Sequence, residues 1–108
     1  MNTNKLTIKS QEAVQKAQMI ALANGQQAVE PGHIVKGVFE TDEHVPQFLL
    51  KKLGVNVEVI KQALDRMVEQ YPKVSGGNPY LSNDAAKMFA EAENSLKDFG
   101  DEYVAIEH

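Results

Sequence analysis

Three histidines, His33, His44 and His108, are the side chains of this sequence that titrate near neutral pH and bind metals most readily. No two of them lie three or four residues apart, the spacing that puts two ligands on one helix face, and there is no cysteine. The glycine-rich stretch at 75–77 lacks the Lys-Ser/Thr of a phosphate-binding loop, and no serine lies in a nucleophile motif. We therefore predict no metal site, no cofactor and no catalytic residue, and do not expect this chain to be an enzyme.

Acidic residues gather toward the C-terminus of the 108-residue chain, whose net charge is −4. Residues up to Leu81 include nine Lys or Arg against eight Asp or Glu, whereas residues from Ser82 onward include two against seven. Nucleic-acid binding depends on basic residues that neutralise phosphates, so no nucleic-acid partner is expected. No apolar run reaches membrane-spanning length, and the polar start of the chain lacks a signal-peptide core. We expect no membrane partner and a cytoplasmic location.

Two related stretches, residues 6–33 and 81–108, organise the chain. A constant offset pairs Gly25 with Gly100 and His33 with His108. Each stretch has the pattern of a capped helix, a glycine stop, a polar turn and the opening of another helix. Such an internal repeat indicates that one structural unit occurs twice.

Capping side chains and apolar residues at helical spacing predict the helices. We expect helices after the caps Thr7, Asn56 and Ser82, one that begins at Pro31, and a short one over 45–53. No stretch alternates convincingly with a period of two, so the predicted fold class is all-α. The apolar faces are expected to consist of Ala13, Val14, Ala17, Ile20, Ala21, Ile34, Val35, Val38, Phe39, Phe48, Leu49, Leu50, Leu53, Val59, Ile60, Leu64, Met67, Val68, Ala85, Met88, Phe89, Ala92, Leu96 and Phe99.

The predicted domain organisation is a single domain over residues 1–108. Its first repeat covers about 6–71, a linker rich in proline and glycine covers 72–80, and a second repeat covers 81–108. The second repeat is shorter, so the chain should contain about five helices and the start of a sixth after Val104. We therefore expect the chain to be part of a longer protein.

Several segments together resemble the Clp N-terminal domain family. The likeness runs through Leu6-Thr7, Ala13, Ala17 and Gly25, then through residues 29–33, 53–55, 72–77, 80–82 and 100–108. The order and spacing of these segments are more specific than any one of them. Within the family, the Glu30-Pro31 pair and the linker are most like the disaggregase chaperones. The protease-linked branch usually carries Gly-Thr-Glu-His at both helix starts, which is absent here.

The resemblance implies a helical bundle of two repeats related by a pseudo-twofold axis. It also implies a parent protein with AAA+ ATPase modules that bind ATP and Mg²⁺ and form a homohexameric ring. The family domain of the disaggregases binds unfolded or aggregated polypeptide for delivery to that ring, with an Hsp70-type chaperone system as collaborator. The alternative is a domain that docks a folded adaptor, as in the protease-linked Clp ATPases.

The polypeptide-contacting residues of the family fall on Thr7, Asp101 and Glu107. The repeat counterparts of the two acids are Gln26 and Gly32, so the acidic pair occurs in one repeat only. A purely structural interpretation stays open at each position, because Thr7 is a good helix cap, Asp101 follows a glycine stop and Glu107 suits a first helical turn.

Overall fold

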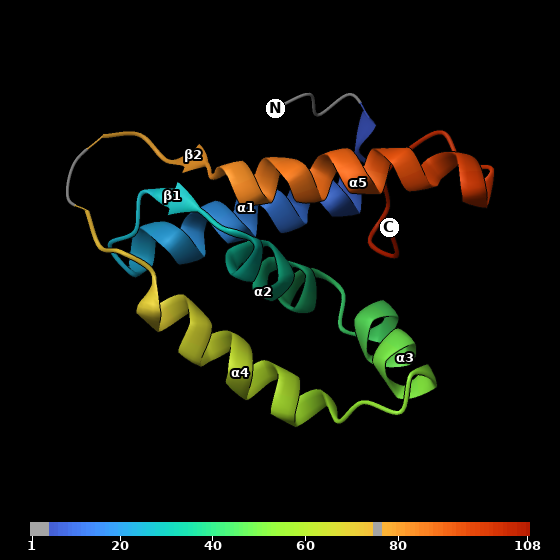
Figure 1. Cartoon of the computed structure of the whole chain (residues 1–108), viewed down its shortest axis with the longest axis horizontal. Coiled ribbons are helices and arrows are strands. Elements are labelled where there is room, and N and C mark those ends of the chain that lie inside the picture. The colour runs from blue at the N-terminus through green and yellow to red at the C-terminus, as the bar shows by residue number, and fades with distance from the viewer. Residues whose placement is uncertain (1–4, 75–76) are drawn as a thin grey trace.

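The structure is a computed structural model that describes residues 5–74 and 77–108. The linker residues Ser75 and Gly76 lie outside the described residues. Five helices and two very short strands follow one another, which confirms the predicted all-α class (Figure 1). The elements are α1 (Ile8–Ala23), β1 (Ala28–Val29), α2 (Pro31–Thr41), α3 (His44–Lys52), α4 (Val57–Gln70), β2 (Tyr80–Leu81) and α5 (Asn83–Phe99).

Side-chain caps fix the starts of three helices where the sequence predicts them. The Thr7 hydroxyl accepts the Ser10 N–H at 3.2 Å, the Asn56 amide oxygen accepts the Val59 N–H at 3.2 Å, and the Ser82 hydroxyl also accepts a backbone N–H. Each bond satisfies a backbone donor that the first helical turn cannot pair by itself. The fourth predicted start, Pro31, is the first residue of α2.

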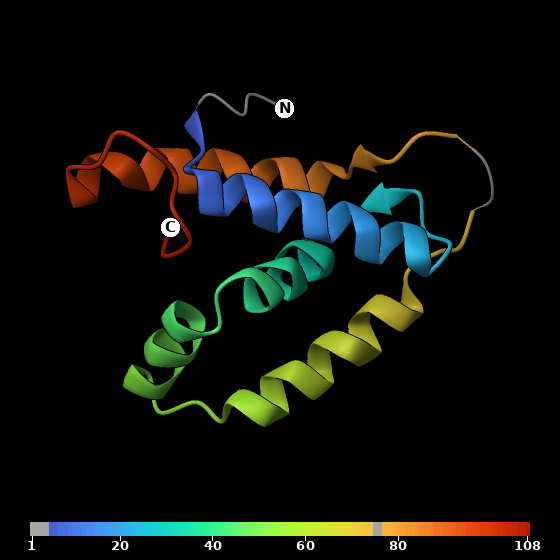
Figure 2. The same ribbon diagram turned by 180° about the vertical axis from the view of Figure 1, so that it is seen from behind.

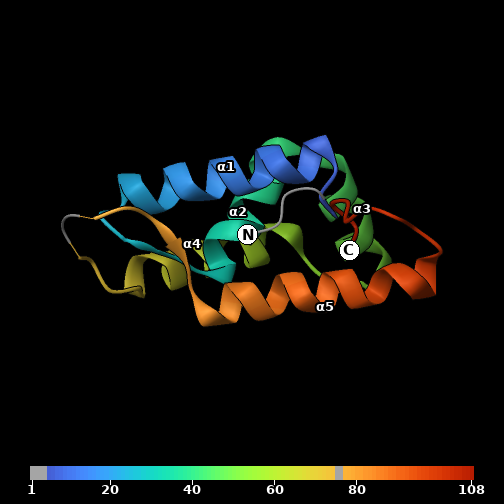
Figure 3. The ribbon, with the colours of Figure 1, turned by 90° about the horizontal axis from the view of Figure 1, so that it is seen from above.

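Helices α1 and α5 run lengthwise along the molecule with α2 between them in the view of Figure 3, and α2 contacts both (Figures 1 and 3). The contact between α1 and α2 is close because Gly37 faces the backbone of Ala13 and Ala17, where a Cβ atom would overlap the Ala13 carbonyl oxygen. Two groups of buried apolar side chains form the core. They are Leu6, Val14, Ala92, Leu96 and Val104 in one group, and Ala17, Ala21, Val29 and Ile34 in the other.

Two short parallel strand pairings join the repeats, which the sequence pattern did not predict. Strand β1 pairs with β2 through Val29 and Leu81, and an isolated parallel bridge joins Leu6 to Val104. The bridge and the strand pair link positions that correspond at the repeat offset, with the two repeats exchanged. The Thr7 N–H donates to the Val104 carbonyl at 2.9 Å, and the equivalent N–H in the second repeat donates to the Val29 carbonyl at 2.9 Å.

Helices α3 and α4 bury fewer apolar side chains than the sequence predicts. In Figure 2, α3 and α4 lie below α2, away from α1 and α5. Helix α3 contains no buried residue, and α4 buries only Leu64 and Val68. The prediction of a buried apolar face was wrong for five residues in or next to these two helices. They are Phe48, Leu49, Leu53, Val59 and Met67, which are 58%, 39%, 75%, 56% and 46% exposed. An apolar stripe identifies the side of a helix that prefers burial, but a neighbouring element has to cover it.

Residues 105–108 form a turn in which the His108 N–H donates to the Ala105 carbonyl at 3.1 Å. The equivalent bond in the first repeat joins His33 to Glu30 at the start of α2, so this turn has the geometry of a helix start. Among the residues that the structure describes, no helix has both the length and the apolar character needed to cross a membrane.

Candidate functional site

The first repeat contains a buried histidine at the start of α2, in a segment that we call the first corner (residues 26–33). The His33 side chain is 0% exposed, and its Nδ1 atom accepts the Glu30 N–H at 2.9 Å. Because Nδ1 accepts a hydrogen bond, the neutral ring has its own proton on Nε2, and this N–H donates to Gln26 Oε1 at 2.7 Å. Burial lowers the pKa of His33 below its ordinary value, which favours this neutral form.

The end of α4 closes the first corner. The Gln26 side-chain nitrogen donates to the carbonyl oxygens of Val68 and Tyr71. The Tyr71 hydroxyl accepts the Gly32 N–H at 3.2 Å, and the Tyr71 ring lies 5.1 Å from the His33 ring. Desolvation by burial raises the pKa of Tyr71, so its hydroxyl stays protonated at neutral pH. The polar groups of this corner are therefore satisfied by the chain itself.

The second repeat builds the same histidine arrangement in the second corner (residues 101–108). His108 Nδ1 accepts the Ala105 N–H at 2.9 Å, and Nε2 lies 2.9 Å from Asp101 Oδ2. The His108 ring packs 5.0 Å from the Phe99 ring, and its side chain is 0% exposed. The partner of this histidine is a carboxylate, whereas the partner of His33 is an amide. The Asp101 side chain is 46% exposed.

Both predicted acids belong to this second corner. Ligand atoms of Asp101, Glu107 and His108 lie within 4.8 Å of one another, and both acids are exposed. Thr7 is joined to the same turn, because its N–H bonds to the Val104 carbonyl, which also accepts the Ser10 hydroxyl at 2.8 Å. The structure therefore brings the two acids together and ties Thr7 to the segment between them.

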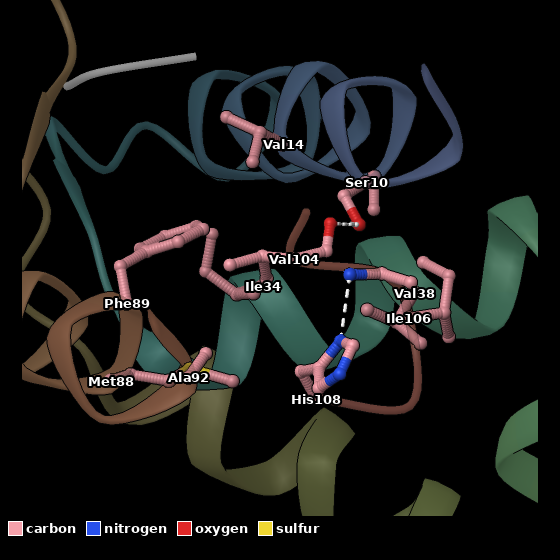
Figure 4. Close-up of a pocket in the computed structure, with 12 residues that line it drawn as sticks. Ser10, Val14, Ile34, Val38, Met88, Phe89, Ala92, Val104, Ile106 and His108 are labelled. Carbon is pink, nitrogen blue, oxygen red and sulfur yellow. Dashed lines mark hydrogen bonds between the residues drawn. The ribbon is translucent and has the colours of Figure 1, made fainter. Parts of the chain in front are cut away.

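An apolar cavity lies beside the second corner. It has a volume of about 70 Å³ and is lined by side chains from α1, α2, α5 and the C-terminal turn. Figure 4 shows Ile34, Val38 and Phe89 around this space, with His108 at its edge. The His108 ring therefore lines the apolar cavity while its Nε2 atom bonds to the Asp101 carboxylate.

Sequence reasoning missed the role of His108. Helical spacing does not predict this pair, because Asp101 and His108 are seven residues apart and meet through a turn. The repeat offset carried the missing signal, since it pairs His33 with His108 and Gln26 with Asp101. Carboxylate and imidazole groups at such distances are also compatible with metal binding, but here the Nε2 proton of His108 is directed at Asp101.

Comparison with known proteins identifies the family. Residues 5–108 match the Clp repeat (R) N-terminal domain. The chaperone protein ClpB of Bacteroides thetaiotaomicron is 46% identical over 108 residues, which is 100% of this chain and 12% of that protein. ClpB of Porphyromonas gingivalis is 44% identical, again over 100% of this chain and 12% of that protein. The chain thus spans about 12% of the length of these curated relatives.

Two solved structures share the fold. The N-terminal domain of the ClpV1 ATPase from E. coli has a TM-score of 0.83 at 17% identity, covering 94% of this chain and 62% of that chain. A protein from a malarial protein secretion system has a TM-score of 0.77 at 21% identity, covering 94% of this chain and 71% of that chain. The family match spans nearly the whole sequence, and the relatives align over their ClpB N-terminal regions. This chain belongs to the Clp N-terminal domain family.

Proposed function

We propose that this chain is the polypeptide-binding domain of a ClpB-like ATP-dependent disaggregase and that the second corner is its binding site. The observation that carries the proposal is the pairing of Asp101 and Glu107 beside an apolar cavity. An unfolded polypeptide presents backbone N–H groups and basic side chains, together with apolar side chains that a folded protein would bury. A surface that joins two acids to an apolar hollow offers partners for both kinds of group.

The acidic pair supplies hydrogen-bond acceptors that remain available to a ligand. Asp101 gives one oxygen to His108 and keeps the other for a ligand, while the Glu107 carboxylate is exposed. Two carboxylates this close together favour a bound cation, because each repels the other in the absence of one. Hydrogen bonds to a charged group contribute about 1.5–3 kcal/mol each, which is roughly a tenfold change in affinity or more.

Thr7 is the third residue of the proposed site. Its side chain caps α1 and contacts the Ser10 hydroxyl, and its residue is half-buried. A hydroxyl oxygen has two lone pairs, so capping one N–H leaves capacity for a second donor. We include Thr7 in the site on this basis and on its backbone bond to Val104.

The parent protein completes the proposed function. In it, AAA+ ATPase modules would hold ATP and Mg²⁺, form the homohexamer and pull on the polypeptide, and an Hsp70-type system would cooperate in the cytoplasm. The domain itself would hold the polypeptide weakly and reversibly near the ring. The similarity to ClpB chaperones supports this role for the domain.

The test is the binding of a fluorescently labelled, permanently unfolded protein to the chain, measured by anisotropy. Asp101→Asn combined with Glu107→Gln should weaken binding by about tenfold or more. Glu91→Gln combined with Asp98→Asn removes the same charge from exposed positions of α5 and should leave binding nearly unchanged. If both double variants bind the unfolded protein with the same affinity, the second corner is not the binding site.

A capture experiment from bacterial lysate separates substrate binding from adaptor docking. A heterogeneous set of unfolded proteins, lost with the acidic pair, is the expected result. Capture of one folded protein at stoichiometric amounts would instead support the docking function of the protease-linked branch.

A further inference from the structure

The two corners share a scaffold and differ in polarity. In each, a fully buried histidine accepts a backbone N–H on Nδ1 and donates from Nε2 to the residue after the glycine stop. In the first corner that residue is Gln26, whose amide offers N–H groups to a second partner. In the second corner it is Asp101, whose carboxylate offers only an acceptor.

The histidine of the first corner decides which way its partner faces. His33 binds Gln26 Oε1, so the Gln26 nitrogen has to face the opposite side, where it finds the carbonyl oxygens of Val68 and Tyr71. The orientation of the amide is thereby set by the imidazole. What the amide then binds is a segment of polypeptide chain, held through its backbone carbonyl groups.

The histidine of the second corner orients its partner in the same way, but the partner is a carboxylate instead of an amide. His108 binds Asp101 Oδ2, so Oδ1 is the free atom of the carboxylate. A carboxylate oxygen repels carbonyl oxygens and attracts N–H groups and cations. This corner is therefore suited to a segment that presents donors, such as a peptide N–H or a basic side chain.

Asp101 lies in an exposed turn, where an unrestrained carboxylate would lose rotamer freedom on binding a ligand. The imidazole beside it is 0% exposed and is held by the Ala105 N–H and the Phe99 ring. A buried ring that binds one oxygen fixes the carboxylate before a ligand arrives, which reduces the entropic cost of binding.

We propose that His108 is the positioning residue of the polypeptide site: by binding Asp101 Oδ2 it directs Oδ1 toward N–H groups or cations of the bound chain. This inference rests on the proposed function and deepens it. It assigns the proposed preference for donor groups to the pair His108–Asp101.

The test is a double-mutant cycle on binding of the labelled unfolded protein to the 108-residue chain. His108→Leu keeps most of the ring volume and removes the donor, and should weaken binding by about three- to tenfold. His108→Gln keeps a side-chain N–H and should restore most of the affinity. His108→Leu in an Asp101→Asn background should have almost no further effect, because the histidine acts through the carboxylate. The exposed His44→Leu serves as the matched control and should bind like the wild type.

The outcomes separate this inference from the proposed function. If Asp101→Asn binds like the wild type, the acidic site itself is refuted. A second outcome is that Asp101→Asn binds weakly and that the affinity loss of the double variant equals the product of the losses of the two single variants. In that case the positioning role of His108 is refuted and the site stands. Circular dichroism checks that each variant is folded. If His108→Leu is unfolded, the ¹⁵N imidazole spectrum of the wild type decides: Nε2 should be protonated and should shift when the polypeptide is added, and no shift would overturn the inference.

Discussion

Replacement of Gln26 by glutamate tests how the first corner holds α4. Gln26 is 2% exposed, its oxygen accepts from His33, and its nitrogen donates to the carbonyl oxygens of Val68 and Tyr71. Glutamate keeps the acceptor for His33 but places a second carboxylate oxygen against two carbonyl oxygens. It also gives the first corner the chemical character of the second.

The expected loss follows from the bonds that disappear. Each buried carbonyl that loses its donor costs about 1–3 kcal/mol. Burial of an unpaired charge adds several kcal/mol, unless the carboxyl takes up a proton. We expect Gln26→Glu to lower the free energy of unfolding by about 3–5 kcal/mol at pH 7, a large part of the 5–15 kcal/mol typical of a domain. At pH 5 the difference should shrink, because a protonated glutamic acid regains a donor.

Urea unfolding followed by circular dichroism at both pH values provides the measurement. Gln27→Glu is the matched control, since Gln27 bonds to the Asn78 carbonyl in an exposed position and the same substitution should cost about 0.5 kcal/mol or less. Equal stability of the two variants at pH 7 would refute the account of the first corner.

Three further predictions concern stability. Gly37→Ala should destabilise the fold by about 1–3 kcal/mol, because the new methyl group overlaps the Ala13 carbonyl oxygen and pushes α2 from α1; an unchanged melting temperature would contradict this. Thr7→Ala should cost about 1 kcal/mol and Thr7→Ser almost nothing in urea unfolding, since serine keeps the capping oxygen; equal losses would show that the cap is unimportant. Burial lowers the pKa of His33 in the folded state, so the unfolded chain binds the proton more readily. The contribution of His33 to the free energy of unfolding should therefore be fully present above about pH 6.5 and decline as the pH falls from 6.5 through the folded pKa. A pKa of His33 at or above 6.5 in an NMR titration would contradict this.

Local features of the fold were predictable from the sequence. The caps Thr7, Asn56 and Ser82 lie within a few residues of the N–H groups that they bind, so short-range patterns contain the necessary information. The buried alanines of α1 were predictable for a similar reason, because helical spacing puts them on one face.

Features that depend on distant segments were not predictable in this way. The bridge between Leu6 and Val104 is only one residue wide on each side, too short for a period-two pattern. The exposure of Phe48 and Val59 depends on which elements cover α3 and α4, and a helical stripe contains no information about that. Both failures arise from packing between elements rather than from helix formation.

The candidate site was predictable only in part. The resemblance placed Thr7, Asp101 and Glu107 together as a group, and the structure puts the two acids in one turn. The bond from His108 to Asp101 needs the backbone turn at Ala105, which helical spacing does not describe. The repeat offset to His33 was the available indication of it.

The central claim is that the second corner binds unfolded polypeptide, and NMR titration of the ¹⁵N-labelled chain tests it most directly. Addition of the unfolded protein should shift the amide signals of Thr7, Asp101 and Glu107 and leave those of Gln26 and Gly32 in place. Shifts confined to the exposed side chains of α3 and α4, with the second corner unaffected, would contradict the account.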